Sequence, residues 1–223
     1  MTPAAVLFDI GGPIDAESEQ ERLIDDALRA EAGGVSDDAY AAAWAEAVAS
    51  FAPNAYQAVL WRLLGARAEQ AWTRVAARLP ARGPFELRPG VAEMLAELTA
   101  RGVPLGVAAN QPLALLPMLE AAGIARHFAS VTISGAVRLR KPDPRIFLHA
   151  CAAMGVAPEA CIMVGDRIDN DIAPARALGM ATVRYRCGRH AGQEPRSWRE
   201  VPDAEVADVA GMRAALFRLL QIT

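Results

Sequence analysis

The sequence lacks the features of secreted, membrane-spanning and nucleic-acid-binding proteins. Its 223 residues include only three cysteines, none in a C-x-x-C pair, so neither a disulfide framework nor a structural zinc site is expected. No apolar run approaches the roughly 20 residues of a membrane-spanning helix. Lys and Arg number 23 against 26 Asp and Glu, whereas duplex-binding proteins usually carry a basic excess. We therefore expect neither a membrane nor a nucleic acid as a partner.

The composition is that of a soluble globular protein. Hydrophobic residues make up 53% of the chain and charged residues 22%, with only 6% aromatics. The first residues contain no basic segment, and Asp9 interrupts the first apolar run, so we expect no signal peptide and a cytoplasmic location. The length suits one domain, or a core domain with a small insertion.

In the first part of the chain, the hydrophobic pattern changes from that of a strand to that of helices. Ala4 to Phe8 is a short apolar run that ends at Asp9 and a Gly11-Gly12-Pro13 loop, which predicts a buried strand. From Glu17 to about Arg82, apolar residues recur at helical spacing. Glycine and proline interrupt this pattern several times, so four helices and no strands are predicted here.

The remainder alternates between strands and helices. After Gly83-Pro84, strands are predicted at 103–109, 130–133, 161–164 and 181–185, and helices at 90–98, 112–122, 143–154, 172–178 and 209–220. Such alternation indicates a mostly parallel sheet with covering helices. The chain is thus predicted to be an α/β protein whose core, residues 1–14 and 84–223, is interrupted by an all-helical insertion, residues 15–83.

Polar residues follow the predicted strands one after another. Asp9 ends the first, Asn110 the second, and Asp166 the fourth, while Lys141 comes shortly after the third. In open parallel sheets, ligands bind outside the carboxyl ends of the strands, so these side chains are expected to meet at one edge. Two carboxylates from different strands suit Mg²⁺. A carboxylate beside a cation and a lysine can also act as a nucleophile.

These segments resemble those of a known family. They are Val6 to Gly12, Asn110, the run Arg140-Lys141-Pro142-Asp143-Pro144-Arg145-Ile146-Phe147, and Gly165 to Asp171. In this order the chain resembles haloacid-dehalogenase-superfamily hydrolases, in the subfamily with a helical cap inserted after the first strand. The resemblance covers nearly the whole chain and implies a Rossmann-like core with helices on both faces, plus a helical cap domain.

The resemblance implies a role for each matching residue. Asp9 corresponds to the nucleophile, which forms an aspartyl-phosphate in the family's phosphatases, and Lys141 to the lysine that steadies the charge. Asp166 and Asp171 correspond to the acids of the Mg²⁺ loop. The main-chain carbonyl of Gly11 corresponds to a further metal ligand, with Asp9 itself also bound to the metal.

Other positions border the expected phosphate pocket or depart from the family's pattern. Asn110, Gly11 and Gly12 correspond to positions around the phosphoryl group. Most phosphatases of the family have a second aspartate where this chain has Gly11, and a serine or threonine where it has Ala109. That aspartate is the family's general acid and base, and nearby Asp15 is one candidate to replace it.

Three functions follow from this pattern. The first is a Mg²⁺-dependent phosphatase for a small phosphorylated metabolite. The second is a metal-independent 2-haloacid dehalogenase, because dehalogenases also lack the second aspartate. The third is a weakly active or inactive member that binds a ligand. The apolar insertion also offers a surface for a homodimer.

Several residues have structural interpretations as well. Asn110 could cap a helix ahead of Pro112, and Asp171 could be an acid at a helix N-terminus. Gly11 and Gly12 could simply allow a tight loop. Asp169 is expected to be a solvated loop acid. The basic stretch Arg184 to Arg189 is expected to cover the sheet edge.

Overall fold

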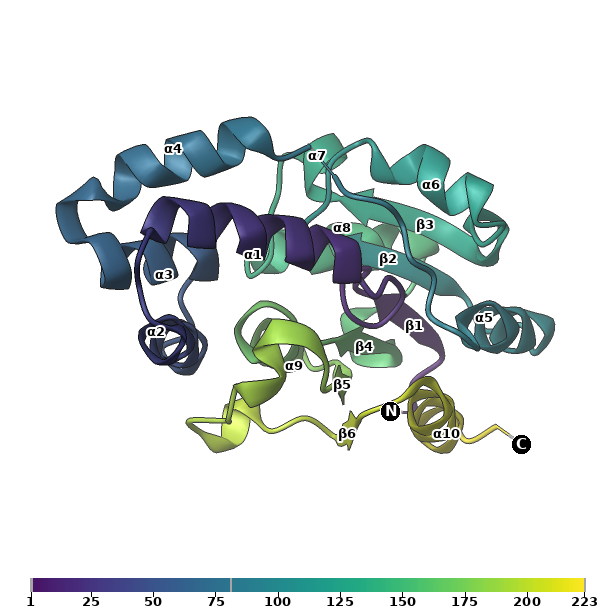
Figure 1. The fold of residues 1–223 in the computed structure, drawn as a ribbon. Coiled ribbons are helices and arrows are strands. Elements are labelled where there is room, and N and C mark those ends of the chain that lie inside the picture. The colour runs from purple at the N-terminus through teal and green to yellow at the C-terminus, as the bar shows by residue number, and fades with distance from the viewer. Residues whose placement is uncertain (1, 81, 223) are drawn as a thin grey trace. The chain divides into compact units, whose positions relative to one another are not determined.

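The computed structural model describes residues 2–80 and 82–222 and contains a six-stranded parallel sheet (Figure 1). The strand order is β3-β2-β1-β4-β5-β6, and every pair of neighbours runs parallel. The strands are β1 Ala5–Phe8, β2 Leu105–Ala109, β3 Phe128–Ile133, β4 Cys161–Gly165, β5 Ala181–Tyr185 and β6 Ala204–Val206. The predicted parallel α/β core is confirmed. The sequence did not reveal β6, which has only three residues and no apolar run.

The first strand lies in the middle of the sheet. All four residues of β1 are buried, and Val6 is in register with Leu105 of β2 and Ile162 of β4. Successive side chains of a strand point to opposite faces. Val6 and Phe8 accordingly belong to one apolar cluster, and Ala5 and Leu7 to another. A continuously apolar strand is therefore explained by burial on both sides.

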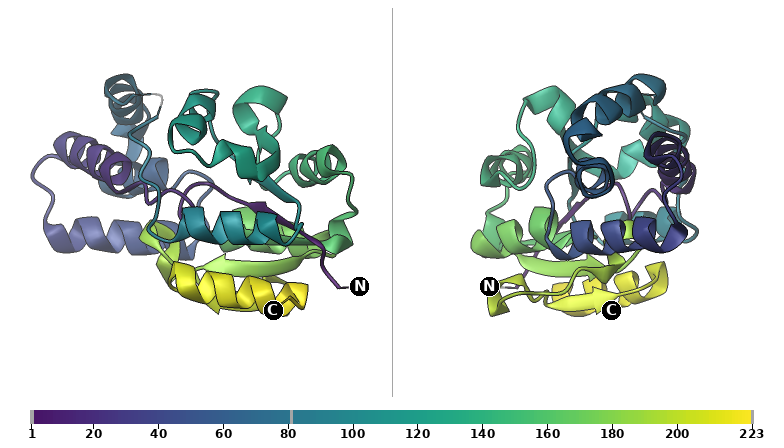
Figure 2. Two further views of the ribbon diagram at one scale, coloured as in Figure 1. Left: turned by 90° about the vertical axis from the view of Figure 1, so that its right-hand side faces the viewer. Right: turned by 60° about the vertical axis from the view of Figure 1, so that its left-hand side comes forward.

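Helices cover both faces of the sheet (Figure 2). The helices α5 Val91–Ala100, α6 Leu115–Ala121 and α10 Val209–Leu220 supply side chains to the cluster that contains Phe8. The helices α8 Pro144–Met154 and α9 Ala173–Ala177 pack on the opposite face. This arrangement places the loops that follow β1, β2 and β4 together at the carboxyl edge of the sheet.

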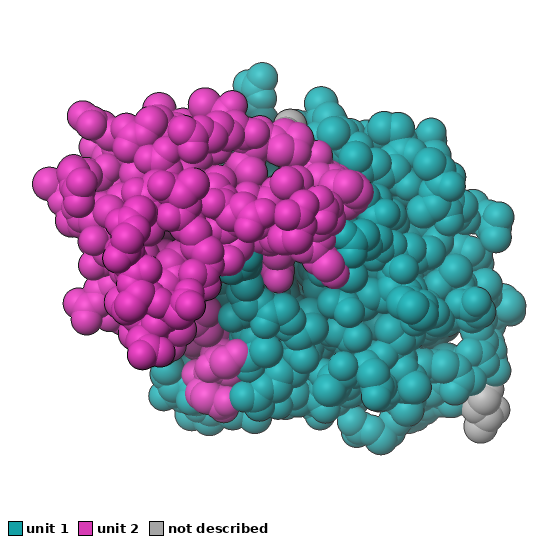
Figure 3. Space-filling model, in the orientation of Figure 1, with its two compact units in different colours: residues 1–16, 85–191, 195–223 teal, residues 17–84, 192–194 magenta. Residues whose placement is uncertain are grey.

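The chain divides into two compact units (Figure 3). One comprises residues 1–16, 85–191 and 195–223, and contains the sheet. The other comprises residues 17–84 with 192–194, and contains the helices α1 Ser18–Ala32, α2 Asp37–Ala49, α3 Ala55–Leu64 and α4 Ala68–Arg78. Compared with the predicted insertion, Asp15 and Ala16 group with the sheet, whereas Pro84 and residues 192–194 group with the helices.

The helical unit has its own apolar core. Leu28, Val59, Leu60 and Val75 are buried in one cluster that draws on α1, α3 and α4. Polar side chains cap the N-terminal ends of α2 and α3, as in α2, where the Ser36 hydroxyl accepts the main-chain N–H of Ala39. Among the described residues, none of the helices combines the length and apolar character needed to cross a bilayer.

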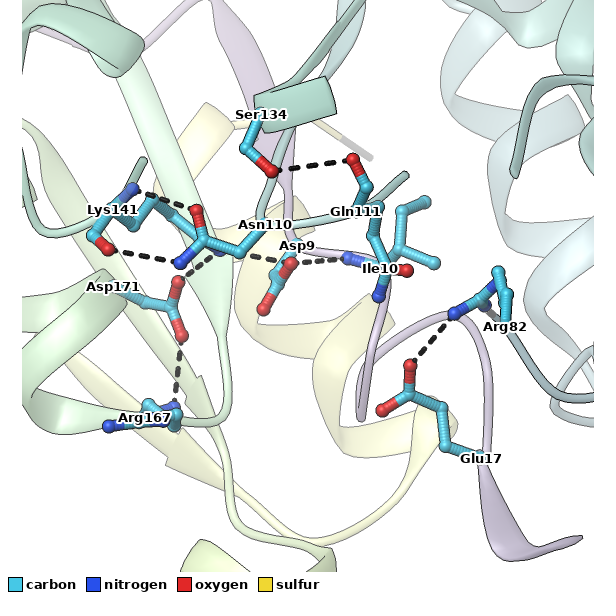
Figure 4. A network of polar contacts seen from close by, with 10 residues as sticks. All are labelled: Asp9, Ile10, Glu17, Arg82, Asn110, Gln111, Ser134, Lys141, Arg167 and Asp171. Carbon is cyan, nitrogen blue, oxygen red and sulfur yellow. Dashed lines mark hydrogen bonds and ion pairs between the residues drawn. The ribbon is translucent and has the colours of Figure 1, made fainter. Parts of the chain in front are cut away.

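The chain leaves the sheet unit after Ala16 and returns to it at Phe85, and these two segments run side by side. Asp15 forms an antiparallel bridge with Leu87, and the Ala16 N–H donates to the Glu86 carbonyl at 2.8 Å. The Asp15 carboxylate also accepts the Glu86 N–H at 2.9 Å. Within the helical unit, Glu17 and Arg82 form an ion pair of 3.1 Å (Figure 4). The segment that leaves the sheet unit and the segment that returns to it are thus bonded to each other on either side of the boundary between residues 16 and 17.

Candidate functional site

Three carboxylates meet at the carboxyl edge of the sheet. Asp9 follows β1, Asp166 follows β4, and Asp171 lies in the turn after Asp166. One carboxylate oxygen from each lies within 4.8 Å of the others. We call these three residues the acidic cluster. The rule that ligands bind beyond the carboxyl ends of strands therefore located Asp9 and Asp166, which are far apart in the sequence.

Lys141 lies between two members of the acidic cluster (Figure 4). Its Nζ is 2.9 Å from Asp9 Oδ1 and 2.6 Å from Asp171 Oδ1, and only 1% of its side chain is exposed. It is also the only lysine of the chain, beside 22 arginines. An ammonium is a compact charge that fits between two carboxylates, whereas the planar guanidinium is larger. The one lysine thus occupies a place that its many arginines would not fill equally well.

Asp171 is fully buried and is held from two sides. Its Oδ1 accepts from Lys141 Nζ, and its Oδ2 accepts the main-chain N–H of Arg167 at 3.0 Å. The short π-helical turn Ile168–Ile172 carries it back toward the end of β4. A Cβ on Gly165 would overlap the Asp171 carboxyl group, so glycine is needed at the end of this strand. Asp169, two residues away, pairs with Arg167 and is not part of the acidic cluster.

Burial and mutual repulsion disturb the titration of the acidic cluster. Burial first, and then the charges of Asp171 and Asp9, raise the pKa of Asp166 well above its usual range. Burial also raises the pKa of Asp171 to about 6, although the Lys141 ammonium opposes this. Burial alone would lower the pKa of Lys141, but the Asp171 and Asp9 carboxylates more than offset this and raise it. Lys141 therefore remains a cation, with two net negative charges left when all three acids ionise.

The acidic cluster fits a divalent cation that prefers oxygen ligands. Mg²⁺ binds one or two carboxylates together with waters and phosphate oxygens. The Asp166 side chain has no hydrogen-bond or ion-pair partner among the residues that the structure describes, so its oxygens are available as ligands. Asp9, Asp166 and Asp171 are the residues that would hold the ion. The Gly11 carbonyl remains a predicted ligand.

Replacing Asp166 with Asn should stabilise the metal-free protein at neutral pH. The folded-state pKa of Asp166 lies above its unfolded value, so the unfolded chain loses this proton first. Stability is therefore lost as the pH rises from about 4 toward the folded pKa, and Asn removes that loss. Urea denaturation in a chelator at pH 5 and pH 8 measures the effect. The variant should exceed wild type at pH 8, with a smaller difference at pH 5.

The same variant tests metal binding independently of activity. A ligand that binds only the folded protein at a hundred times its dissociation constant adds about 2.7 kcal/mol to the free energy of unfolding. Mg²⁺ should therefore stabilise wild type and have much less effect on Asp166→Asn. Equal stabilisation of both proteins by Mg²⁺ would show that Asp166 is not a ligand.

The two glycines after Asp9 form a tight turn. Gly12 has a φ of +88°, a conformation that side chains rarely adopt, and its N–H donates to the Asp15 carbonyl at 2.9 Å. A Cβ at Gly12 would lie 2.9 Å from Asp166 Cβ. Arg88 donates from Nε to the Gly12 carbonyl. The tight turn and the close approach to Asp166 are therefore enough to explain a glycine at position 12. A contact between Gly12 and a phosphoryl group stays a prediction.

Asn110 and Asp15 are engaged with the main chain. The Asn110 amide makes two hydrogen bonds to the main chain of Lys141. Asp15 is buried and lies outside the acidic cluster. Its carboxylate oxygen Oδ1 accepts a hydrogen bond from the Glu86 N–H. Ala109 is fully buried at the end of β2. Neither Asp15 as the replacement acid nor Asn110 as a phosphoryl ligand is tested by these contacts, and both stay predictions.

Arg184 is a site-supporting residue that the sequence interpretation missed. It is fully buried on β5, where its Nη1 pairs with Glu205 Oε2 at 2.9 Å and its Nη2 donates to the His190 carbonyl at 3.0 Å. Its Nε lies 3.4 Å from the Asp166 carbonyl. The expectation that this residue covers the sheet edge is wrong, because β6 occupies that edge. The signal in the sequence that could have indicated a buried, paired Arg184 was its position inside an otherwise apolar strand.

Comparison with known proteins identifies a family. The family model of the haloacid dehalogenase-like hydrolases matches residues 3–179. Glyceraldehyde 3-phosphate phosphatase of Methanopyrus kandleri is 40% identical over 119 residues, which are 53% of this chain and 51% of the relative. Phosphoserine phosphatase of Thermus thermophilus is 39% identical over 126 residues, 56% of this chain and 49% of the relative. The chain spans about half the length of the curated relatives that it matches.

Solved structures share the fold over nearly the whole chain. A haloacid dehalogenase-like family protein from Streptococcus pneumoniae superposes with a TM-score of 0.72 at 19% identity, covering 96% of this chain and 99% of that one. A HAD phosphatase from Thermococcus onnurineus has a TM-score of 0.60 at 25% identity, covering 95% and 97%. A 2-haloacid dehalogenase from Pseudomonas syringae has a TM-score of 0.61 at 23% identity, covering 97% and 99%. Phosphatases and dehalogenases thus share this architecture.

Proposed function

The chain belongs to the haloacid dehalogenase-like hydrolases, and from this membership we propose that it is a Mg²⁺-dependent phosphatase for a small phosphorylated metabolite. The observation that carries the proposal is the lone buried lysine between Asp9 and Asp171, with Asp166 completing the acidic cluster. A metal-independent dehalogenase would not need Asp166. The names of the curated relatives, phosphatases of glyceraldehyde 3-phosphate and phosphoserine, support a small phosphorylated substrate.

Asp9 is the proposed nucleophile. Its Oδ1 accepts from the Ile10 N–H at 2.7 Å and lies 2.9 Å from Lys141 Nζ (Figure 4). Among the described residues, its Oδ2 has no such partner, so this oxygen is the one available to attack phosphorus. Attack forms a bond from Oδ2 to phosphorus and breaks the bond to the leaving oxygen, which gives an aspartyl-phosphate. Water then releases phosphate and regenerates the carboxylate.

Lys141 and the bound cation offset the charge of the acids. Without them, the acidic cluster would repel an anionic substrate. The Lys141 ammonium, fixed at Asp9, can stabilise negative charge that develops on the phosphoryl oxygens. Asp9, Asp166 and Asp171 would hold Mg²⁺, which would supply further charge neutralisation for those oxygens.

The residues present favour substrates with a good leaving group. Gly11 cannot protonate a leaving oxygen, and general acid catalysis is typically worth about 10²- to 10⁴-fold in rate. Ala109 offers no hydroxyl to the phosphoryl group. The aryloxide of an aryl phosphate or the carboxylate of an acyl phosphate needs little protonation as it leaves, so we propose that such substrates are turned over faster than alkyl phosphates.

Phosphate release from an aryl phosphate tests the proposal. We expect turnover with Mg²⁺ and little turnover in a chelator, because without a cation the carboxylates of the acidic cluster oppose the approach of an anionic substrate. Turnover of an alkyl phosphate serves as the comparison for the missing general acid. Halide release from a 2-haloacid that persists in a chelator would instead support the dehalogenase. Ligand binding with no turnover of either substrate would support a binding protein. The cytoplasmic location and the homodimer stay predictions.

A further inference from the structure

The main chain of Lys141 has a side-chain partner in place of a neighbouring strand. Lys141 lies in the irregular segment between α7 Ser134–Val137 and α8, and it is buried. Its N–H donates to Asn110 Oδ1 at 2.8 Å, and its carbonyl accepts from Asn110 Nδ2 at 3.0 Å (Figure 4). One planar amide thus satisfies both polar groups of a single residue, 31 positions away in the sequence.

This pairing answers a need that the local sequence creates. Buried main-chain N–H and C=O groups require partners. The next residue, Pro142, has no N–H to continue a regular pattern. Two hydrogen bonds from one rigid amide hold the two peptide groups that flank the Lys141 Cα, and so fix the position and the orientation of this residue's main chain. A single hydrogen bond would hold only one of these two peptide groups.

We infer that Asn110 is a positioning residue that holds the Lys141 main chain so that Nζ lies between Asp9 and Asp171. The catalytic consequence of this inference rests on the proposed function, but the placement of Lys141 does not. The resemblance to the family instead implied a contact between Asn110 and the phosphoryl group. The amide retains one N–H for such a contact, so the two roles have to be separated by experiment.

The position of Nζ depends on where the lysine main chain is held. A lysine side chain has four rotatable bonds, and its ammonium can point in many directions. Here both acceptors of Nζ are carboxylates on other elements, after β1 and after β4. Asn110, at the end of β2, anchors the other end of the same side chain. The ammonium is therefore fixed at both ends of its carbon chain.

Amine labelling can test this placement without any assay of activity. Because Lys141 is the only lysine, acetylation with an acyl ester followed by mass spectrometry reports on one side-chain amine. In wild type, burial and ion pairing should protect it. We expect Asn110→Ala to accelerate acetylation of Lys141 at least about tenfold. Protein unfolded in urea gives the rate for the unprotected amine.

A matched variant controls for general loosening of this edge. The Ser134 hydroxyl donates to the Gln111 carbonyl at 3.3 Å, beside Asn110 but without contacting Lys141. Ser134→Ala should therefore leave the labelling rate unchanged. Asn110→Asp keeps the acceptor for the Lys141 N–H and loses the donor to its carbonyl, so it should be intermediate. It also serves if Asn110→Ala fails to fold.

A double-mutant cycle then separates positioning from phosphoryl contact. Removing a residue that orients a catalytic group typically costs about 10- to 100-fold, and we expect that loss of kcat on an aryl phosphate for Asn110→Ala. In a Lys141→Ala background the same substitution should cost almost nothing, because its target is gone. An equal loss in both backgrounds would overturn the positioning role.

The labelling result also stands alone if the enzyme has no phosphatase activity. Faster labelling of Lys141 in Asn110→Ala supports the inference even when wild type releases no phosphate, a result that would count only against the proposed function. Labelling that stays as slow as in wild type, in a variant that circular dichroism shows to be folded, would overturn the inference.

Discussion

Replacing Asp9 with Asn is expected to lower phosphate release by at least about 10⁴-fold, to the background rate. Asn has nearly the same shape, so it can still accept the Ile10 N–H through its side-chain oxygen. Its amide is not a nucleophile, and loss of a nucleophile removes the covalent route entirely. Initial rates of phosphate release from an aryl phosphate at saturating Mg²⁺ measure this effect.

The matched control for Asp9→Asn is Asp169→Asn. Asp169 is an acid of the same edge that pairs with Arg167 and lies outside the acidic cluster. This variant should retain turnover close to wild type, which separates a specific loss from a general effect of removing a carboxylate. Wild-type rates from Asp9→Asn would exclude Asp9 as the nucleophile. They would then direct attention to another acid or to an attacking water.

Replacing Lys141 should remove both activity and stability, and two variants separate charge from shape. Lys141→Met keeps an unbranched chain but leaves Asp9 and Asp171 without their cation. Breaking a buried ion pair from one side typically costs about 3–5 kcal/mol. Loss of one electrostatic donor to a transition state typically costs about 10²- to 10³-fold in rate. Lys141→Arg keeps the charge but has to fit a larger planar group into a buried site.

The stability loss in Lys141→Met should grow as the pH rises. Burial already raises the pKa of Asp171 to about 6 against the opposing effect of the Lys141 ammonium, and removal of that ammonium raises it further. The unfolded chain then loses the proton of Asp171 at lower pH than the folded chain does. Stability is therefore lost as the pH rises from about 4 through the folded pKa. Urea denaturation in a chelator at pH 5 and pH 8 measures this trend.

Lys141→Arg has a different expected outcome in the same measurements. Its charge remains, so the stability loss should depend less on pH than that of Lys141→Met. Activity should still fall by at least about 10²-fold, because a guanidinium cannot take the place of an ammonium 2.9 Å from Asp9 and 2.6 Å from Asp171. Full activity in Lys141→Arg would show that only the charge matters.

The sequence by itself determined five of the six strands and the polar residues that follow them. The continuous apolar runs before Asp9 and Gly165 predicted buried strands, and the alternation of such runs with helical segments predicted a parallel sheet covered on both faces. The residues after such strands share one edge of the sheet, which brought Asp9 and Asp166 together in the prediction. The prediction of the strands and of the meeting of Asp9 and Asp166 rests on local patterns and one general rule of topology, so it did not require the tertiary structure.

The tertiary structure alone decided which side chains pair. The sequence left Asp171 open as an acid at a helix start, whereas packing buries it against Lys141, 30 positions away. It also left Asn110 open as a helix cap or a ligand, and the fold joins its amide to the Lys141 main chain. Arg184 was misplaced because the short strand β6 gave no local signal. Pairings of this kind depend on distances between elements that are far apart in the chain, and local sequence patterns do not encode such distances.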